Sequence, residues 1–510
     1  MTSTPPAQVR SPGLTLLTAC FGTLLVLIDY TSPLTTLTPT ARDLGIGPTA
    51  QTWVLTGTLV GLAALLLTMG SAADDHGRKR VFGAGAVLLL LSTALSAAAP
   101  GSAVFLTGRV LQGCAAAALL APSLGLIGHA HPAGPARVKA LGTWGASVGL
   151  GIALGPVYAA LLERAGGWRT VYWVLAALSA LLVLLTAYGL DESRTDRPRR
   201  LDPLGVLLLA AGSSGLIAGL AEGRHGWGRP AVLVLLGAGA LLLALFVVVE
   251  SRVAEPMLDL SLFRSPGFIA GTSGALFTGL SIVGLMSYLP AVLQQSLGEP
   301  PLTAALVLAV WSGLSVVSAL QARRLAGRLS ATTQVAGSLL LCGIGEAAMY
   351  GLRAGGSWVH LVPGLAVTGI GSGILNAALA RLAVSSVPPD RAAMGSGANN
   401  SARYLGSALG VAVMVTVVSR ASSSEGPSHA MAAGINDAFL VAAAFCAAGA
   451  AVALWARAAE SRAAAAIAAA GRPVADAGAG HLALHPGGPG RHRRPAVGEV
   501  RRPGGRPRPD

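Results

Sequence analysis

The sequence predicts an all-α membrane protein with about fourteen membrane-spanning helices. Of its 510 residues, 53% are hydrophobic and 11% are charged, and the mean hydropathy is +0.64, a composition that ordinary soluble domains do not have. Apolar runs of about 20 residues, long enough to cross a hydrocarbon core as helices, recur along almost the whole chain. Basic residues gather in alternate connections between these runs, as expected of cytoplasmic loops.

The apolar runs give the expected helices in chain order. Six lie in the first half of the chain, at residues 14–38, 51–72, 81–99, 103–128, 141–161 and 171–190. Two more follow at 203–221 and 230–250, and the last six lie at 267–293, 302–321, 333–352, 358–380, 400–420 and 438–456. We therefore expect two six-helix bundles, over residues 14–190 and 266–457, joined by residues 191–265 with two extra helices.

Charge predicts the orientation of these helices. The net charge of +14 does not indicate nucleic-acid binding, because the basic residues lie between apolar runs and so report topology. The positive-inside rule then places both termini in the cytoplasm, with tails over residues 1–13 and 458–510. The C-terminal tail is rich in Ala, Gly, Pro and Arg and is expected to be disordered. Arginine greatly outnumbers lysine, which suggests a GC-rich bacterial source and hence a bacterial plasma membrane.

The sequence carries no pattern typical of an enzyme. The four cysteines lie in or beside apolar runs, without paired spacing or flanking histidines, which predicts neither disulfides nor a metal site. No nucleophile triad, phosphate-binding loop or acidic cluster accompanies them. We expect no enzymatic activity, no cofactor and no metal.

The connection between the second and third runs is short and charged. It reads Gly70-Ser-Ala-Ala-Asp74-Asp75-His76-Gly77-Arg78-Lys79-Arg80. Gly77 permits a tight turn, the basic cluster anchors the inner face, and Asp74 near a helix end can pair with a cation or a helix N-terminus. From the residues alone, the segment is either a simple topological anchor or a specific contact between helices.

Arg109 is the only formally charged residue between Val81 and Ala136. An arginine at the centre of a membrane helix costs roughly 2.5 to 3.5 kcal/mol, so it usually faces a protein interior or a wet cavity. Gln112 and Gly113 lie three and four residues further on and share its helical face. From the residues alone, one role for it is structural, holding helices together through bonds to backbone carbonyls.

The fifth run is unusually rich in glycine. At helical pitch Gly142, Gly145, Gly149 and Pro156 share one face, and Gly151, Gly155 and Ala159 share the opposite one. Both faces therefore let neighbouring helices approach closely, while Pro156 removes a backbone donor and allows a kink. Packing alone explains such glycines, as does a helix that must bend or rock.

Other polar residues lie inside apolar runs. Asp29, in the first run, is a candidate proton carrier near Arg109, with a structural role in bonding neighbouring helices as the alternative. Glu346 is either a cavity residue or a solvated group near the outer surface. Gln112 and Asn376 are further candidates for a substrate cavity, and Asn376 also suits hydrogen bonding between helices.

These segments resemble the signatures of the major facilitator superfamily. Gly70, Asp74, Gly77, Arg78 and Lys79 match its loop signature, in which Asp75 replaces a usual arginine. Arg109, Gln112 and Gly113 match its second signature, and Gly142, Gly151, Gly155 and Pro156 match the spacing of its antiporter motif. Asp29 and Thr31 match its drug:proton branch, although Pro39 lies one residue later than expected.

The resemblance implies a fourteen-span drug:proton antiporter. The loop would be a gate, Asp29 and Arg109 would couple protons, and small amphiphilic drugs or antibiotics would leave the cell by alternating access between the two bundles. We expect a monomer in the lipid bilayer, conferring multidrug or antibiotic resistance. The alternatives are a nutrient symporter or uniporter, which the fifth run disfavours, and a membrane receptor or membrane-embedded enzyme.

Overall fold

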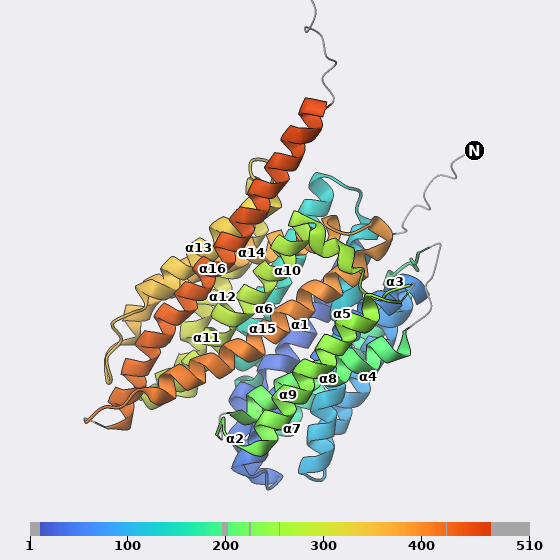
Figure 1. Cartoon of the computed structure of the whole chain (residues 1–510). Helices are drawn as coiled ribbons and strands as arrows, with labels where there is room; N and C mark the ends of the chain where they lie inside the picture. Colours follow the sequence, from blue (N-terminus) through green and yellow to red (C-terminus); the bar gives the residue numbers. More distant parts are fainter. Residues whose placement is uncertain (1–10, 196–201, 224–225, 254, 425, 471–510) are drawn as a thin grey trace, which may run out of the picture. The chain divides into compact units, whose positions relative to one another are not determined.

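The computed structural model describes residues 11–195, 202–223, 226–253, 255–424 and 426–470, and these residues form helices without any strand (Figure 1). The first half contains α1 (Pro12–Thr31), α2 (Pro33–Asp43), α3 (Pro48–His76), α4 (Arg78–Ala97), α5 (Ser102–Ala130), α6 (Pro135–Gly166) and α7 (Trp168–Gly189). The linker contains α8 (Pro203–Gly223) and α9 (Pro230–Glu250).

The second half begins after a short 3-10 turn, η1 (Leu260–Arg264). Its helices are α10 (Pro266–Thr278), the π segment η2 (Gly279–Val283), α11 (Gly284–Gln295), α12 (Pro301–Ala326), α13 (Ala331–Ala348), η3 (Trp358–Leu361), α14 (Val362–Ser385), η4 (Pro389–Arg391), α15 (Ala392–Arg420) and α16 (Pro427–Ala470). The chain up to Arg462 is one compact unit, and Ala463–Asp510 is a separate one.

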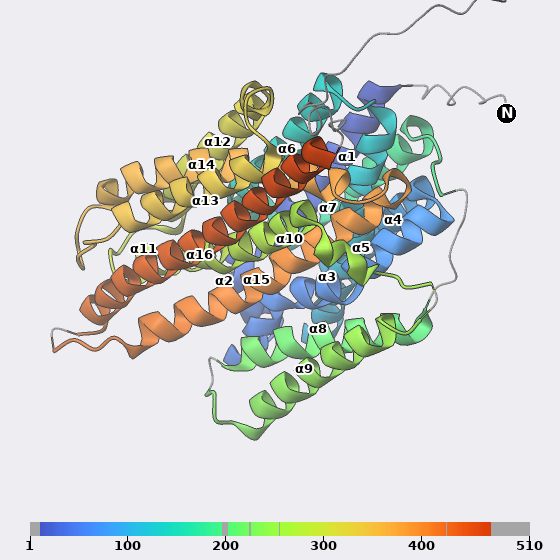
Figure 2. The same ribbon diagram turned by 45° about the horizontal axis from the view of Figure 1, so that its top comes forward.

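The described residues form two large hydrophobic cores. One is built almost wholly from residues of α1 to α7, with a few from α8, α14 and α15. The other is built almost wholly from α10 to α16. The linker helices lie beside these bundles as a pair, in which α8 packs on α3 and α15 while α9 packs on α8 (Figure 2).

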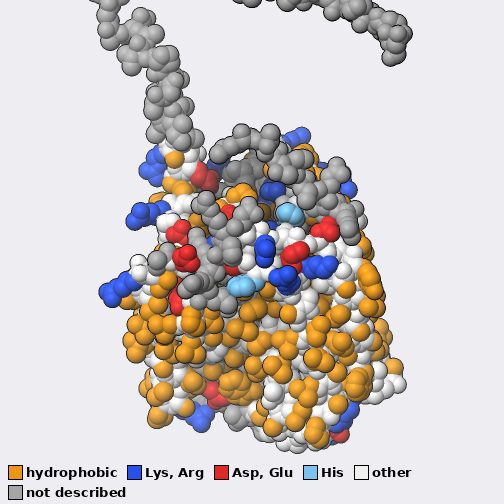
Figure 3. Space-filling model, turned by 90° about the vertical axis from the view of Figure 1, so that its right-hand side faces the viewer, with side chains coloured by type: hydrophobic (Ala, Val, Ile, Leu, Met, Phe, Trp, Pro, Cys, Tyr) orange, Lys and Arg blue, Asp and Glu red, His pale blue; other side chains and the backbone are white. Residues whose placement is uncertain are grey.

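The apolar surface has the form expected of a membrane protein. Thirteen helices within the described residues are long and apolar enough to span a bilayer. The 18-residue helix α13 is not among these thirteen, because Gln334 and Glu346 lower its hydropathy, and it packs on α14. Figure 3 shows a wide belt of hydrophobic side chains, with charged side chains gathered at its two ends.

Three elements differ from the expected helices. The first run is broken between α1 and α2, because Pro33 has no amide hydrogen to continue the helical ladder. The ninth run carries the π segment η2 in its middle. The last helix reaches Ala470, since alanine strongly favours helix, so the start of the segment expected to be a tail is helical. Residues 1–10 and 471–510, where the rest of the expected tails fall, lie outside the described residues.

Candidate functional site

Asp29 and Arg109 meet in the interior of the first bundle. Arg109 Nη1 lies 3.2 Å from Asp29 Oδ1, and both side chains are almost completely buried. The same nitrogen donates to the backbone carbonyl of Asp29 at 3.3 Å, and Nε donates to the carbonyl of Val54 on α3 at 3.1 Å. The arginine thus connects α5 to α1 and α3. It forms both an ion pair with Asp29 and hydrogen bonds to backbone carbonyls.

Gln112 extends this pair into a network. Its Oε1 accepts a hydrogen bond from Arg109 Nη1 at 2.6 Å, while its amide nitrogen donates to Ser96 Oγ on α4 at 3.1 Å. Among the described residues, Arg109 Nη2 is buried without a hydrogen-bond partner. An unpaired donor on a buried guanidinium is costly, so this N–H group is available to a further acceptor beside the Asp29 carboxylate.

The loop between α3 and α4 binds the second half of the protein. Asp74 accepts hydrogen bonds from the backbone N–H groups of Ala393 at 3.2 Å and Met394 at 2.8 Å, at the N-terminus of α15. It also accepts two from Arg78, the shorter at 2.6 Å. A carboxylate at a helix N-terminus is stabilised by the helix dipole, so Asp74 joins α3 and α4 to α15 rather than acting only as a topological anchor.

The remaining residues of this loop divide between the two halves. Arg78 also donates to the carbonyls of Pro389 and Asp390 in η4 at 3.4 and 3.2 Å. Lys79 Nζ instead donates to Ala187 on α7, within the first half. Gly70 lies against α15, where a Cβ would come within 2.6 Å of the Ala393 carbonyl, and Gly77 adopts a φ of 122°, which favours glycine.

Asp75 forms a further contact across the halves that sequence analysis missed. Its Oδ1 lies 2.7 Å from Nη1 of Arg391, and both side chains are nearly buried. Two features of the sequence could have indicated this contact. Asp75 stands where the loop signature usually has an arginine, and the basic residue Arg391 precedes the thirteenth expected helix. Asp74 and Asp75 therefore each join the α3–α4 end of the first half to the second half.

The glycines of α6 contact both bundles, as expected from their two faces. On one face, a Cβ on Gly151 would lie 2.7 Å from Leu27 of α1, and Gly155 lies directly against Thr31. On the other face, a Cβ on Gly142 would lie 3.1 Å from the Ala319 carbonyl of α12, and Gly145 lies against α14. The helix therefore forms a close interface with each half, next to the Asp29 segment of α1.

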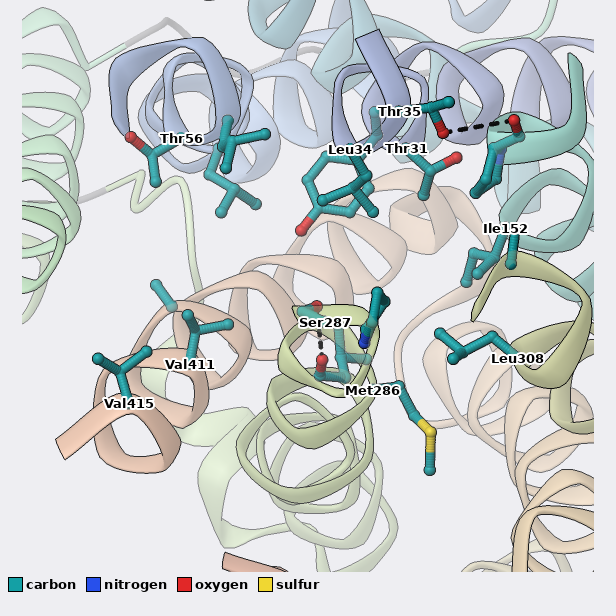
Figure 4. Close-up of a pocket in the computed structure, with 18 of the residues that line it drawn as sticks. Thr31, Leu34, Thr35, Thr56, Ile152, Met286, Ser287, Leu308, Val411 and Val415 are labelled. Atoms are coloured by element: carbon teal, nitrogen blue, oxygen red, sulfur yellow. Dashed lines mark hydrogen bonds between the residues drawn. The ribbon is translucent and has the colours of Figure 1, made fainter. Parts of the chain in front are cut away.

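A cavity lies between the two halves, beside the Asp29–Arg109 pair. Tyr30 and Thr31, which directly follow Asp29, line it together with residues of α2, α3, α6, α8, η2, α11, α12 and α15. In Figure 4, Thr31 and Leu34 lie across the cavity from Met286 and Ser287, and Val411 and Val415 of α15 lie beside them. None of the described residues that line it carries a formal charge.

Three residues expected in a substrate cavity do not line this one. Gln112 is fully buried in the arginine network, and Asn376 is buried where α14 packs on α6. Glu346 is fully buried in α13, which also contradicts the alternative of a solvated group near the outer surface. Helical periodicity could not distinguish residues buried between packed helices from residues that line the cavity, because apolar and small residues surround both kinds of position.

Among the residues that the structure describes, no group of three or more His, Cys, Asp or Glu side chains is arranged to hold a metal ion. All four cysteines are free. The polar groups of the cavity are hydroxyls, one amide and indole nitrogens, from Tyr30, Thr31, Thr35, Thr56, Ser287, Ser312, Gln294, Trp227 and Trp311. These side chains suit hydrogen bonding to an amphiphilic organic molecule.

Comparisons with known proteins agree on one family. Residues 19–411 match the model of the Major Facilitator Superfamily. The chain is 34% identical to a puromycin resistance protein of Streptomyces alboniger, covering 80% of this chain and 82% of that one. It is 33% identical to a cephamycin export protein of Amycolatopsis lactamdurans, covering 84% and 89%. A multidrug resistance protein of Mycobacterium tuberculosis is 30% identical, with 80% and 76% covered.

Solved structures share the fold at lower identity. A proton:xylose symporter superposes with a TM-score of 0.62 at 14% identity, covering 87% of this chain and 95% of that one. The human organic anion transporter MFSD10 superposes with a TM-score of 0.60 at 18% identity, covering 88% of this chain and 100% of that one. The arrangement of helices is therefore that of these transporters.

Proposed function

The chain belongs to the major facilitator superfamily, and from this premise we propose that it exports small amphiphilic drugs or antibiotics in exchange for protons. It is a multi-pass membrane transporter and not an enzyme. One observation supports the proposal most strongly: the buried Asp29–Arg109 pair lies directly beside an uncharged cavity between the two halves. A proton site and a drug site would thus be neighbours.

The cavity suggests the class of substrate. Because its lining carries no carboxylate, nothing there would neutralise a doubly charged cation, and a neutral or singly charged amphiphile fits better. Three relatives are named for puromycin, cephamycin and multiple drugs. We extend from these names only the general class, a small organic molecule with apolar surface and a few hydrogen-bonding groups.

Asp29 is the proposed proton carrier. When it is ionised it pairs with Arg109, and when it binds a proton this ion pair is lost, so the guanidinium must rely on Gln112 and backbone carbonyls. Tyr30 and Thr31 follow Asp29 in the same helix and line the cavity. A change of charge at Asp29 would therefore alter the wall that a drug contacts.

The α3–α4 loop suggests which conformation is present. We place this end of the protein in the cytoplasm of a bacterium, with both termini on that side, because basic residues are concentrated there. The contacts of Asp74 and Asp75 with η4 and α15 join the two halves at this end. The structure then corresponds to a monomer closed to the cytoplasm, and export requires these contacts to break and re-form in each cycle.

Drug susceptibility tests this function. A bacterium that lacks its own exporters should become more resistant to puromycin and to chemically different amphiphilic drugs when it expresses this chain. An uncoupler that collapses the proton gradient should remove the effect. Unchanged susceptibility across diverse drugs would contradict drug export, and efflux insensitive to the uncoupler would contradict proton coupling.

A further inference from the structure

A buried carboxyl group also lies in the second half of the protein. Glu346, on α13, has a side chain with no exposed surface. Within the described part of the chain, its carboxyl oxygens have no polar partner other than the thiol of Cys446 and form no salt bridge. This differs from Asp29, whose carboxylate is matched by Arg109.

The neighbours of Glu346 are weakly polar. Its titratable neighbours are two thiols, Cys342 one turn earlier on α13 and Cys446 on α16. On the side of α14, Thr368 contacts Gly345. The backbone carbonyl of Thr368 accepts a hydrogen bond from the Cys342 thiol at 3.5 Å. A thiol is only a weak hydrogen-bond donor, so these groups replace very little of the hydration that an ionised carboxylate loses.

The energetics of this environment favour the neutral acid. Burying an unpaired carboxylate in an apolar interior is so costly that such a group usually takes up a proton instead. A glutamine or leucine would fill the same space without a titratable group. This environment therefore favours the protonated form of Glu346 in the present conformation.

A connection leads from Glu346 to the cavity. The sulfur of Cys446 lies 3.0 Å from the hydroxyl of Ser281, which belongs to the π segment η2. Val283 at the end of the same segment lines the cavity, as does Met286 in the next turn. Single π turns inside helices occur often at functional sites, and this one joins the surroundings of Glu346 to the cavity wall.

The π segment is also held firmly on its other side. Gly279 lies directly against the backbone of α15 at Arg403, and a Cβ on Gly284 would lie 2.7 Å from Gly410. Such close backbone contacts leave α15 and η2 little freedom to move independently. A change at Ser281 would therefore be transmitted to α15, which lines the cavity through Val411 and Val415.

We propose that Glu346 is a second proton-binding site, linked to the cavity through Cys446, Ser281 and η2. On release the carboxyl O–H bond breaks, the proton passes to water admitted from the cavity, and the carboxylate accepts from the Cys446 thiol. That the released proton is exchanged for a drug rests on the proposed function, whereas its binding and release do not. The exchange cycle then moves one proton through each bundle.

Infrared spectroscopy of the purified full chain tests proton binding without any drug. The difference spectrum between acidic and alkaline buffer should contain a carboxylic C=O band that is absent from Glu346→Gln and present in Asp29→Asn. Glu346→Leu, an apolar side chain that needs no partner, serves the same comparison if the amide variant fails to fold. Identical carboxylic bands in the wild type and the position-346 variant would overturn the proposal.

Proton counting in liposomes tests the link to transport. With puromycin as the probe, Glu346→Gln should move one proton fewer per drug molecule, while the matched control Glu163→Gln should move as many as the wild type. An unchanged proton count in Glu346→Gln would overturn the coupling of this site. If the wild type moves no puromycin, the proposed function fails, and the infrared comparison still decides whether Glu346 binds a proton.

Discussion

The carboxylate of Asp75 and the guanidinium of Arg391 lie 2.7 Å apart and join the two halves of the protein. Ser71 also contacts Asp75, with its hydroxyl 3.4 Å from Oδ2. The loop signature that this chain resembles has an arginine in place of Asp75. The present chain therefore closes its α3–α4 end with an additional ion pair next to the Asp74 contacts.

Arg391→Gln should weaken this closure. The change breaks the buried ion pair between Asp75 and Arg391, and removing one partner of such a pair costs about 3 kcal/mol or more. Opening of the loop end relieves that cost by hydrating the carboxylate. We expect the closed conformation to lose population by about 100-fold relative to the open one. Distance measurements between spin labels on α3 and α15 at this end would show the shift.

The charge-swapped pair Asp75→Arg with Arg391→Asp should restore closure, because the ion pair is re-formed with reversed polarity. Arg80→Gln is the matched control, since Arg80 is an exposed residue of the same loop whose ion-pair partner among the described residues is Glu192 of the first half. A swap no better than the single variants, or an equal shift in Arg80→Gln, would show that the pair does not control closure.

Gly155→Val should reduce transport while leaving insertion intact. Gly155 lies directly against Thr31 of α1, so a branched side chain would push α1 away from α6 at a cost of about 1 to 3 kcal/mol. Because Thr31 lies two residues from Asp29, the ion pair with Arg109 would be displaced as well. Drug efflux from cells should fall, whereas Gly337→Val, at a position of α13 with open space around it, should transport normally.

Ile217→Trp should change drug selectivity. Ile217 belongs to the linker helix α8 and lines the cavity. The indole of a tryptophan would narrow the cavity there and weaken the binding of bulky drugs by about 1 kcal/mol or more. Resistance to large drugs should fall more than resistance to small ones. Leu207→Trp, which introduces the same side chain at an exposed position of α8, is the control. Equal effects of both variants would show that α8 is not part of the substrate site.

The contact between α2 and α7 should resist acid. Hydrogen bonds from Arg169 and then Trp168 lower the pKa of Asp43, which lies outside the membrane-spanning segments. A lowered pKa means that the stabilising contribution is present above the ordinary pKa of aspartate and is lost only as the pH falls through the lowered value. The backbone amides of residues 40–46 should therefore remain protected from hydrogen exchange in mildly acidic buffer. Asp43→Asn should remove the pH dependence of this protection.

Much of the fold was predictable from sequence, because membrane helices need long apolar runs and leave a strong periodic signal. All fourteen expected runs correspond to helices, including α13, and the α8–α9 pair lies between the halves in sequence as expected. The break at Pro33 and the π segment η2 were not predicted. Such breaks depend on local backbone geometry, which hydropathy does not report.

The candidate site was predictable only where charge lies in an apolar run. Asp29 and Arg109 were expected to meet because an unpaired charge in a membrane is costly, and the two faces of α6 followed from helical pitch. The cavity was not predictable, since its lining is mostly Leu, Ala, Val, Ile and small hydroxyl residues like those of the surrounding interior. The Asp75–Arg391 contact required knowing which loop faces which helix.

Proton-driven puromycin transport by Asp29→Asn and wild type, each purified in liposomes with an imposed pH gradient, tests the central claim most directly. The wild type should move puromycin against its gradient and dissipate the pH gradient as it does so. Asp29→Asn, with a side chain of the same shape that cannot exchange a proton, should do neither while still binding the drug. Gradient-driven accumulation by Asp29→Asn at the wild-type rate would contradict proton coupling through the Asp29–Arg109 pair.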